Sequence, residues 1–402
     1  MLLFQSIFIY TLFALLLYIV SKKGNTNKTL YNKQFNNFFS LPRKYWGCIF
    51  IFSLFSGIRY DVGVDHTSYL ENYIDAINGQ WLIRERGIEE GYYLITMLCS
   101  QLYIHPVIYF GFLAAIQLYF LLLAMRDEEQ ATTYMLVTLV LGGAYLMWMN
   151  GIRQIVAAAI FVVAAIQIPQ GKLKTFLLLL LFAYTWHHSV IILVPLYLLK
   201  YDRLIWNKRW INLIILAICI IIGNIPSWIG LMTRLGGLLD FIGYDYYVER
   251  LSDLTDLDKM SSHLFGPRKL IQLACNIMII ILYPIVRVAF QDSSKIDIFF
   301  KLSFIGMCLF YLFDNTLVVF RRPIEYFTIF ILPLIGYTLH YLKSKKGKEI
   351  SYIMMLFFSC SFLYLQCYIE NKKPKIERQS TLYRTYWCDE NRYQLRAPND
   401  IL

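Results

Sequence analysis

A small set of ionisable side chains lies within or beside long apolar segments of the sequence, where a charge is costly. These side chains are Arg59, Asp65, Arg153, His187, Arg321 and Arg322. Charged groups at membrane depth are energetically expensive and usually face a cavity or a partner. A guanidinium binds phosphate oxygens two at a time, and an imidazole or a carboxylate accepts a proton from a hydroxyl group. The residue types therefore predict a site for a phosphate or pyrophosphate next to a general base.

Each of these residues also has a purely structural interpretation. A single Arg is equally well explained as an anchor at the membrane surface or as part of a structural ion pair. Asp65 stands just before Thr67 and suits a helix N-cap as well as a catalytic role. His66 is expected to be a solvated loop residue. The feature that favours a functional site is the convergence of charges from separate chain regions on one side of a membrane.

The composition requires a membrane environment. Of the 402 residues, 58% are hydrophobic and only 16% are charged, whereas soluble domains carry about 25% charged residues. Apolar stretches of about 17–25 residues, long enough to cross a bilayer as a helix, recur along the chain. We therefore expect an all-α integral membrane protein of about twelve transmembrane helices with outer surface helices. The polytopic membrane domain covers 1–369, with outer loops 59–106 and 230–268, and a C-terminal tail follows at 370–402.

The charges predict how the chain is oriented. The net charge of +11 arises from Lys and Arg in short loops, so it indicates topology and no affinity for nucleic acid. Loops 21–44 and 343–348 are basic and belong in the cytoplasm, whereas the acidic loop 59–90 belongs outside. The eight cysteines are scattered, and no cluster has the spacing of metal ligands. We expect no disulfide framework, no metal and no cofactor.

The expected spans are the main apolar segments of the chain. They are 2–20, 42–58, 107–125, 131–149, 152–168, 173–186, 188–200, 210–229, 269–290, 297–317, 324–342 and 350–369. Segment 91–104 is too short to cross, so it is expected at the outer surface. The first segment lacks a preceding basic residue and a cleavage site, which predicts a retained span. Twelve crossings place both termini outside, although the tail after Ile369 is basic, against the positive-inside rule.

Segments 173–186 and 188–200 predict a short hairpin. Each arm is only about 20 Å long, so the apex at His187, His188 and Ser189 stops below the outer surface. The hairpin then forms the floor of an outward-facing cavity. Because an imidazole titrates near neutrality, His187 is the favoured base, and Asp65 orients the acceptor or the imidazole. Asp65 remains open as the alternative base.

Five short motifs occur in order along the chain. They are R-Y-D-V-G-V-D-x-x-x-Y (Arg59 to Tyr69), E-E-G-Y-Y (Glu89 to Tyr93), N-G-I-R-Q (Asn150 to Gln154), W-H-H-S (Trp186 to Ser189) and R-R-x-x-E-Y-F (Arg321 to Phe327). In this order the sequence resembles the EpsG family, the Wzy-like polymerases of bacterial exopolysaccharides, capsules and O-antigens. The resemblance runs from about residue 50 to 330.

The resemblance assigns roles residue by residue. It implies catalytic roles for His187 and Asp65, and binding of pyrophosphate or sugars by Arg59, Tyr69, Glu90, Asn150, Arg153, Gln154, Arg321 and Arg322. Either Arg321 or Arg322 occupies the late arginine position of the family. Trp186 replaces the more usual Phe. The tail lacks the Pro-Tyr pair expected near the C-terminus, which leaves its role undefined.

The same resemblance implies an activity and a location. It implies a polymerase in the bacterial inner membrane whose active site faces the periplasm and whose fold is like the type C membrane glycosyltransferases. A growing glycan would move from undecaprenyl pyrophosphate onto a sugar hydroxyl of the next lipid-linked repeat unit. The expected partners are this lipid-linked oligosaccharide, the bilayer, a flippase and a chain-length regulator.

Two other classes fit part of the pattern. A flippase or another transporter would also contain charged residues inside a helical bundle. However, the halves of the sequence show no internal repeat, and the charges gather at one face rather than near the midplane. An O-antigen ligase-type transferase would use the same lipid donor and stays open. A membrane acyltransferase would need its His on the side of its acyl donor.

Overall fold

The computed structural model shows a helical protein. It describes residues 2–22, 38–80, 88–201, 206, 208–228, 230–232, 266–291, 293, 295–316, 320, 322–372 and 381–385. Within these residues the regular elements are helices. An isolated antiparallel bridge also pairs Arg59 with Thr385. The all-α prediction is therefore confirmed for the part of the chain that the structure describes.

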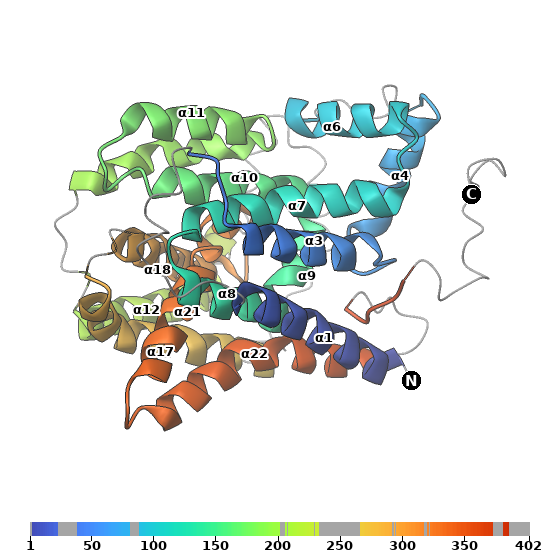
Figure 1. Ribbon diagram of the computed structural model, residues 1–402. Coiled ribbons are helices and arrows are strands. Elements are labelled where there is room, and N and C mark those ends of the chain that lie inside the picture. Colours follow the sequence, from blue (N-terminus) through green and yellow to red (C-terminus); the bar gives the residue numbers. More distant parts are fainter. Residues whose placement is uncertain are drawn as a thin grey trace.

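Every predicted apolar segment is helical over most of its length (Figure 1). The helices are α1 (Leu2–Lys22), α3 (Arg43–Gly57), α7 (Pro106–Met125), α8 (Glu129–Leu141), α9 (Ala144–Asn150), α10 (Ile152–Ala165), α11 (Leu173–Tyr184), η1 (His188–Tyr201), α12 (Arg209–Gly223), α17 (Pro267–Ala289), α18 (Lys295–Phe313), η3 (Arg322–Ile324), α20 (Glu325–Thr328), α21 (Ile331–Ser344) and α22 (Glu349–Asn371). Two short helices, α4 (His66–Ile77) and α6 (Glu90–Gln101), lie in the predicted first outer loop. The predicted surface segment 91–104 thus corresponds to α6.

The number of membrane crossings is smaller than predicted when it is judged by helix length. Among the described helices, five are long and apolar enough to cross a membrane, namely α1, α7, α17, α18 and α22. The count rises to seven if α8 with α9, which meet at a bend of 68°, and α12 with Pro226–Met232 each form one span. The structure therefore supports a multi-pass membrane protein and does not confirm twelve crossings.

The surface and the centre of the bundle have the composition of a protein in lipid. Large apolar side chains are exposed along α1, α11, α12 and α22, among them Phe4, Phe8, Leu178, Leu181, Ile214, Ile221 and Phe357. At the centre, every residue of α10 except Arg153 is buried. A helix that is apolar and buried on all sides belongs in the middle of a bundle. Arg153 is therefore the only residue of α10 whose side chain is not buried.

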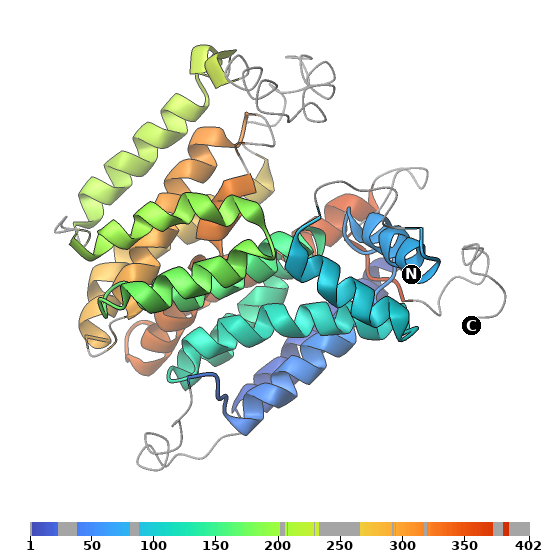
Figure 2. The same ribbon diagram turned by 90° about the horizontal axis from the view of Figure 1, so that it is seen from above.

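Helices from the two halves of the chain surround α10. In Figure 2, α3 and α7 lie on one side of α10 and α11, and α12, α17 and α18 lie on the other. α11 and η1 pack against each other around a turn at Thr185–His187, as the predicted hairpin requires. Both arms are short, at 12 and 14 residues. This turn lies beside the start of α6, since the Gly91 N–H donates to the Thr185 carbonyl at 2.7 Å.

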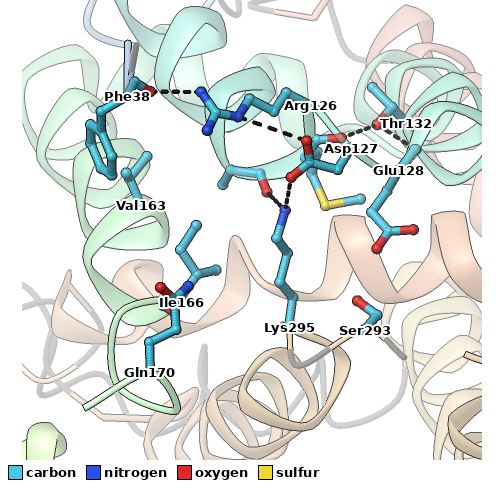
Figure 3. Close-up of polar contacts among 12 residues, drawn as sticks. Phe38, Arg126, Asp127, Glu128, Thr132, Val163, Ile166, Gln170, Ser293 and Lys295 are labelled. Carbon is cyan, nitrogen blue, oxygen red and sulfur yellow. Dashed lines mark hydrogen bonds and ion pairs between the residues drawn. The ribbon is translucent and has the colours of Figure 1, made fainter. Parts of the chain in front are cut away.

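The two ends of the bundle differ in charge. We call the end that carries α4 and α6 the acidic-loop end, and the opposite end, where α7 meets α8 and α18 begins, the basic-loop end (Figure 1). Figure 3 shows a polar network at the basic-loop end. Lys295 Nζ donates to the Ala124 carbonyl at 2.9 Å and lies 3.0 Å from Asp127 Oδ2, while Arg126 Nη1 donates to the Phe38 carbonyl at 2.7 Å. These contacts tie three separate chain segments together.

Candidate functional site

The polar centre of the acidic-loop end is a carboxylate that joins an arginine and a histidine. The side chain of Glu89 is 6% exposed, and its Oε2 accepts a hydrogen bond from Arg153 Nη1 at 2.5 Å. Its other oxygen, Oε1, lies 2.6 Å from His187 Nδ1. We call these three residues the Glu89 cluster. They come from the start of α6, the first turn of α10 and the turn between α11 and η1.

The hydrogen bond to Glu89 sets the tautomer of His187. An ionised carboxylate can only accept, so Nδ1 must carry the proton that is shared with Oε1. In a neutral imidazole the other nitrogen, Nε2, is then the acceptor. A histidine held in this way is prepared to take a proton at Nε2, as in catalytic sites where a buried acid orients the base. His187 is 19% exposed at its side chain, so it is partly accessible.

The neighbours of Glu89 keep it ionised. Burial alone raises the pKa of this carboxyl, but the hydrogen bond from His187 and the charge of Arg153 outweigh burial and hold the pKa below its ordinary value. Glu89 is therefore a carboxylate at neutral pH. It neutralises the guanidinium of Arg153, which also lies 5.4 Å from the centre of the Tyr92 ring.

Tyr69, the last residue of the Arg59-to-Tyr69 motif, connects that motif to this cluster. It lies one turn into α4, and its ring meets that of Tyr92 edge to face at 6.0 Å, on the same ring that Arg153 lies over. Burial raises the pKa of Tyr69 and keeps the phenol protonated, while the charge of Arg153 acts in the opposite direction. The structure thus brings three predicted site residues, Tyr69, Arg153 and His187, to one place.

Two predicted binding residues contact backbone instead. Asn150 Oδ1 accepts from the Val64 N–H at 2.7 Å, which fastens the first loop to the end of α9. Gln154 Nε2 donates to the carbonyl of Arg322, which fastens η3 to α10. Arg322 itself extends an exposed side chain. Arg321 lies outside the described residues.

The structure does not bring the remaining predicted residues, Arg59, Asp65 and Glu90, into contact with the three residues of the cluster. The side chain of Arg59 is fully buried, its Nη1 donates to the Val62 carbonyl, and its guanidinium lies 5.6 Å from the Phe110 ring centre. Asp65 is exposed at the N-cap position of α4, makes no capping hydrogen bond with its side chain, and adds to the high pKa of Tyr69 through its charge. Glu90 is 71% exposed at its side chain and lies 3.4 Å from His188 Nε2.

The expectation for His66 is wrong. Its side chain is buried, its Nδ1 accepts from the Asp61 N–H at 3.3 Å, and its ring lies 5.0 Å from that of Phe110. The local sequence carries no signal for this burial, because Phe110 belongs to α7. His66 is therefore part of the packing beneath the first loop.

Sequence reasoning also missed Glu89, although a signal was present. Glu89 shares one helical face with Tyr92, Thr96 and Ser100, the buried residues of α6. That face repeats at the period of an amphipathic helix, so the buried acid of the Glu89–Glu90 pair could have been identified from spacing alone. Among the described residues, no group of three or more His, Cys, Asp or Glu side chains is placed to hold a metal ion.

These helices and this buried polar cluster define a multi-pass membrane protein with a site near one end of the bundle. The EpsG family model matches residues 44–381, and the chain belongs to the EpsG family. Membership supports, at the level of the family, an enzyme with a polysaccharide-polymerase type of role. No curated protein and no solved structure matches the chain.

Proposed function

We propose that this protein polymerises a bacterial surface polysaccharide. In this proposal it transfers a growing glycan from undecaprenyl pyrophosphate to the next lipid-linked repeat unit at the outer, periplasmic face of the inner membrane, in the manner of Wzy-type polymerases. Membership in the EpsG family supports the class of reaction. The observation that carries the assignment of the site is the bridge that Glu89 makes between Arg153 and His187.

The proposed reaction is a direct transfer. A hydroxyl oxygen of the acceptor sugar bonds to the anomeric carbon of the donor glycan, while the bond from that carbon to the pyrophosphate oxygen breaks. The hydroxyl proton passes to Nε2 of His187, and undecaprenyl pyrophosphate leaves with the electron pair. His187 is the general base and Asp65 orients the acceptor.

The charge balance of the Glu89 cluster suits this reaction. Glu89 and Arg153 neutralise each other before the transfer. When His187 takes the proton, the cluster becomes cationic at the moment the leaving pyrophosphate becomes more anionic. Arg153, together with the exposed side chain of Arg322, would contact the pyrophosphate oxygens, for which a guanidinium has the matching geometry.

Deletion of the gene tests the proposed function against its rivals. Gel analysis of surface polysaccharide should show a single-repeat band in place of the ladder formed with the wild-type protein. Loss of every repeat from the surface would instead identify a flippase. Accumulation of lipid-linked polymer would identify a ligase-type transferase, which shares the donor and the chemistry.

Complementation of the deletion strain tests the base. His187→Ala should give no ladder at matched membrane levels, whereas Asp65→Asn should give a shorter or fainter one. His188→Ala serves as the control, because His188 lies against the exposed Glu90 rather than Glu89. An inactive Asp65→Asn beside an active His187→Ala would make Asp65 the base.

A further inference from the structure

A short segment near the C-terminus is buried against the helices at the acidic-loop end. Residues 381–385, which we call the C-terminal strap, follow α22 and include Leu382 and Tyr383 at 0% exposure. The Tyr10 hydroxyl donates to the Thr381 carbonyl at 2.9 Å, and the Tyr383 N–H donates to Ser6 Oγ at 2.8 Å. The strap is therefore anchored to α1 through both backbone and side-chain contacts.

Tyr383 adds an anchor on α3. Its hydroxyl donates to the Phe55 carbonyl, and its ring meets that of Tyr10 edge to face at 5.3 Å. On the other side, the Thr381 N–H donates to Glu370 Oε2 at 2.8 Å, which joins the strap to the end of α22. Three helices thus hold the strap in one place.

The strap in turn holds the first-loop motif. The Tyr60 N–H donates to the Arg384 carbonyl at 2.9 Å, within the antiparallel bridge between Arg59 and Thr385. Arg384 Nη1 lies 3.1 Å from Asp61 Oδ2, and both side chains are largely buried. We call residues 59–64 the Arg59 turn. Strap and turn are more than 300 residues apart in the sequence, with a separation of 323 between Arg384 and Asp61.

The Arg59 turn has a backbone that needs such support. Asp61 has a φ of +51°, a backbone conformation that residues other than glycine rarely adopt. Gly63 has a φ of +94°, and a Cβ there would lie 2.5 Å from Asn150 Oδ1. Backbone of this kind persists only where the surrounding contacts determine it. The strap supplies these contacts from one side and Asn150 from the other.

We propose that Tyr383 and Arg384 are positioning residues for glycan transfer. By holding the Arg59 turn, the strap sets where α4 begins, and α4 carries Tyr69 to the Tyr92 ring that Arg153 also contacts. The chain of contacts runs from Arg384 to Asp61, along α4 to Tyr69, and from Tyr69 through the Tyr92 ring to Arg153. The proposal rests on the proposed function and gives residues 381–385 of the tail a role in it.

Arg384→Ala tests the positioning role against Arg287→Ala. Both variants remove the arginine of an Arg–Asp pair, but the Arg287–Asp297 pair lies at the basic-loop end. With purified protein and a lipid-linked repeat unit, Arg384→Ala should raise KM for the acceptor about tenfold, whereas Arg287→Ala should leave it unchanged. Arg384→Lys should recover most of the activity, because the contact uses a single nitrogen of the side chain.

A second measurement is independent of activity. Hydrogen exchange of the amides in residues 58–70 should be faster in Arg384→Ala and in Tyr383→Phe than in the wild type, because the Arg59 turn loses its support. Tyr383→Phe removes only the hydrogen bond to Phe55 and keeps the ring, so it preserves the packing of the strap.

The outcomes separate this proposal from the proposed function. Faster exchange with a raised KM supports the positioning role. Unchanged exchange, or a KM that shifts equally in Arg287→Ala, overturns it. A wild-type protein that transfers no glycan refutes the proposed function, whereas an active wild type beside an Arg384→Ala variant with unchanged KM refutes the positioning role alone.

Discussion

Glu89 and Glu90 are adjacent in the sequence but lie in opposite environments. Glu89 is buried between Arg153 and His187, whereas Glu90 is exposed and faces His188. A buried carboxylate with both oxygens engaged can orient a base and balance a charge. An exposed ion pair contributes little, because water screens it.

Glu89→Gln should therefore lower kcat by about 10²–10⁴-fold, the usual size of a lost acid–base contribution. The amide keeps the volume of Glu89 but removes the negative charge that balances Arg153 and favours the proton on Nδ1 of His187. Turnover of a lipid-linked repeat unit in detergent or nanodiscs measures this effect. Glu90→Gln is the matched control and should remain near wild-type activity. Equal losses in the two variants would contradict the role of Glu89.

The lowered pKa of Glu89 also predicts a dependence of stability on pH. The folded-state pKa lies below the unfolded value of about 4.3. The stability that ionised Glu89 contributes is fully present above the unfolded pKa and is lost as the pH falls through the folded pKa. Thermal unfolding should show a higher Tm for the wild type than for Glu89→Gln at pH 7 and a smaller difference below pH 4. A Tm difference that became larger in acid would contradict the lowered pKa of Glu89.

At the scale of elements, the site depends on how α6 docks against the turn between α11 and η1. The Gly91 N–H donates to the Thr185 carbonyl at 2.7 Å, and a Cβ on Gly91 would lie 2.9 Å from that same oxygen. The close approach of the two backbones sets the distance between Glu89, just before α6, and His187, just after the turn. Glycine is required there for space.

Gly91→Ala should consequently destabilise the protein by about 1–3 kcal/mol, the cost of overpacking, and should shorten the polysaccharide ladder. The added methyl group pushes α6 away from the turn and lengthens the contact between Glu89 and His187. Gly266→Ala is a suitable control, since a Cβ at that position at the start of α17 meets nothing within 4 Å. Thermal unfolding and ladder length are measured for both variants. Wild-type behaviour of Gly91→Ala would show that the close approach has no effect on the site.

At the scale of the whole molecule, the charges divide between the two ends of the bundle. The basic segment around Lys343 and Lys345 and the Lys295 network lie at one end, and α4 and α6 lie at the other (Figure 1). From the positive-inside rule we expect the basic-loop end in the cytoplasm. The Glu89 cluster would face the opposite side of the membrane.

Cysteine labelling tests this orientation. Ser68→Cys in α4 should react with an impermeant thiol reagent in intact spheroplasts, because Ser68 is exposed at the acidic-loop end. Lys345→Cys, exposed at the opposite end, should react only after lysis. The wild-type protein gives the background from native cysteines. The reverse pattern would place the Glu89 cluster in the cytoplasm and exclude a periplasmic polymerase.

The sequence by itself determined the features that depend on neighbouring residues. Apolar length predicted where the helices form, because the run of apolar side chains and the helical rise are local properties. A short apolar run identified the surface helix that became α6. The predicted topology brought Arg153 and His187 to one side of the membrane, and the resemblance to the EpsG family implied Tyr69 as a further site residue. The resemblance was confirmed by the match over residues 44–381.

The tertiary structure decided the features that depend on contacts between distant segments. It paired Glu89 with Arg153 and His187, buried His66 against Phe110 of α7, and joined the strap to the Arg59 turn. Bends and short helices such as α8 with α9 determine how many apolar segments can cross the membrane. The physical reason is the same in each case, because the environment of a side chain is set by residues that meet it in space. Glu89 and Glu90 therefore acquired different partners only when α6, α10 and the turn between α11 and η1 packed together.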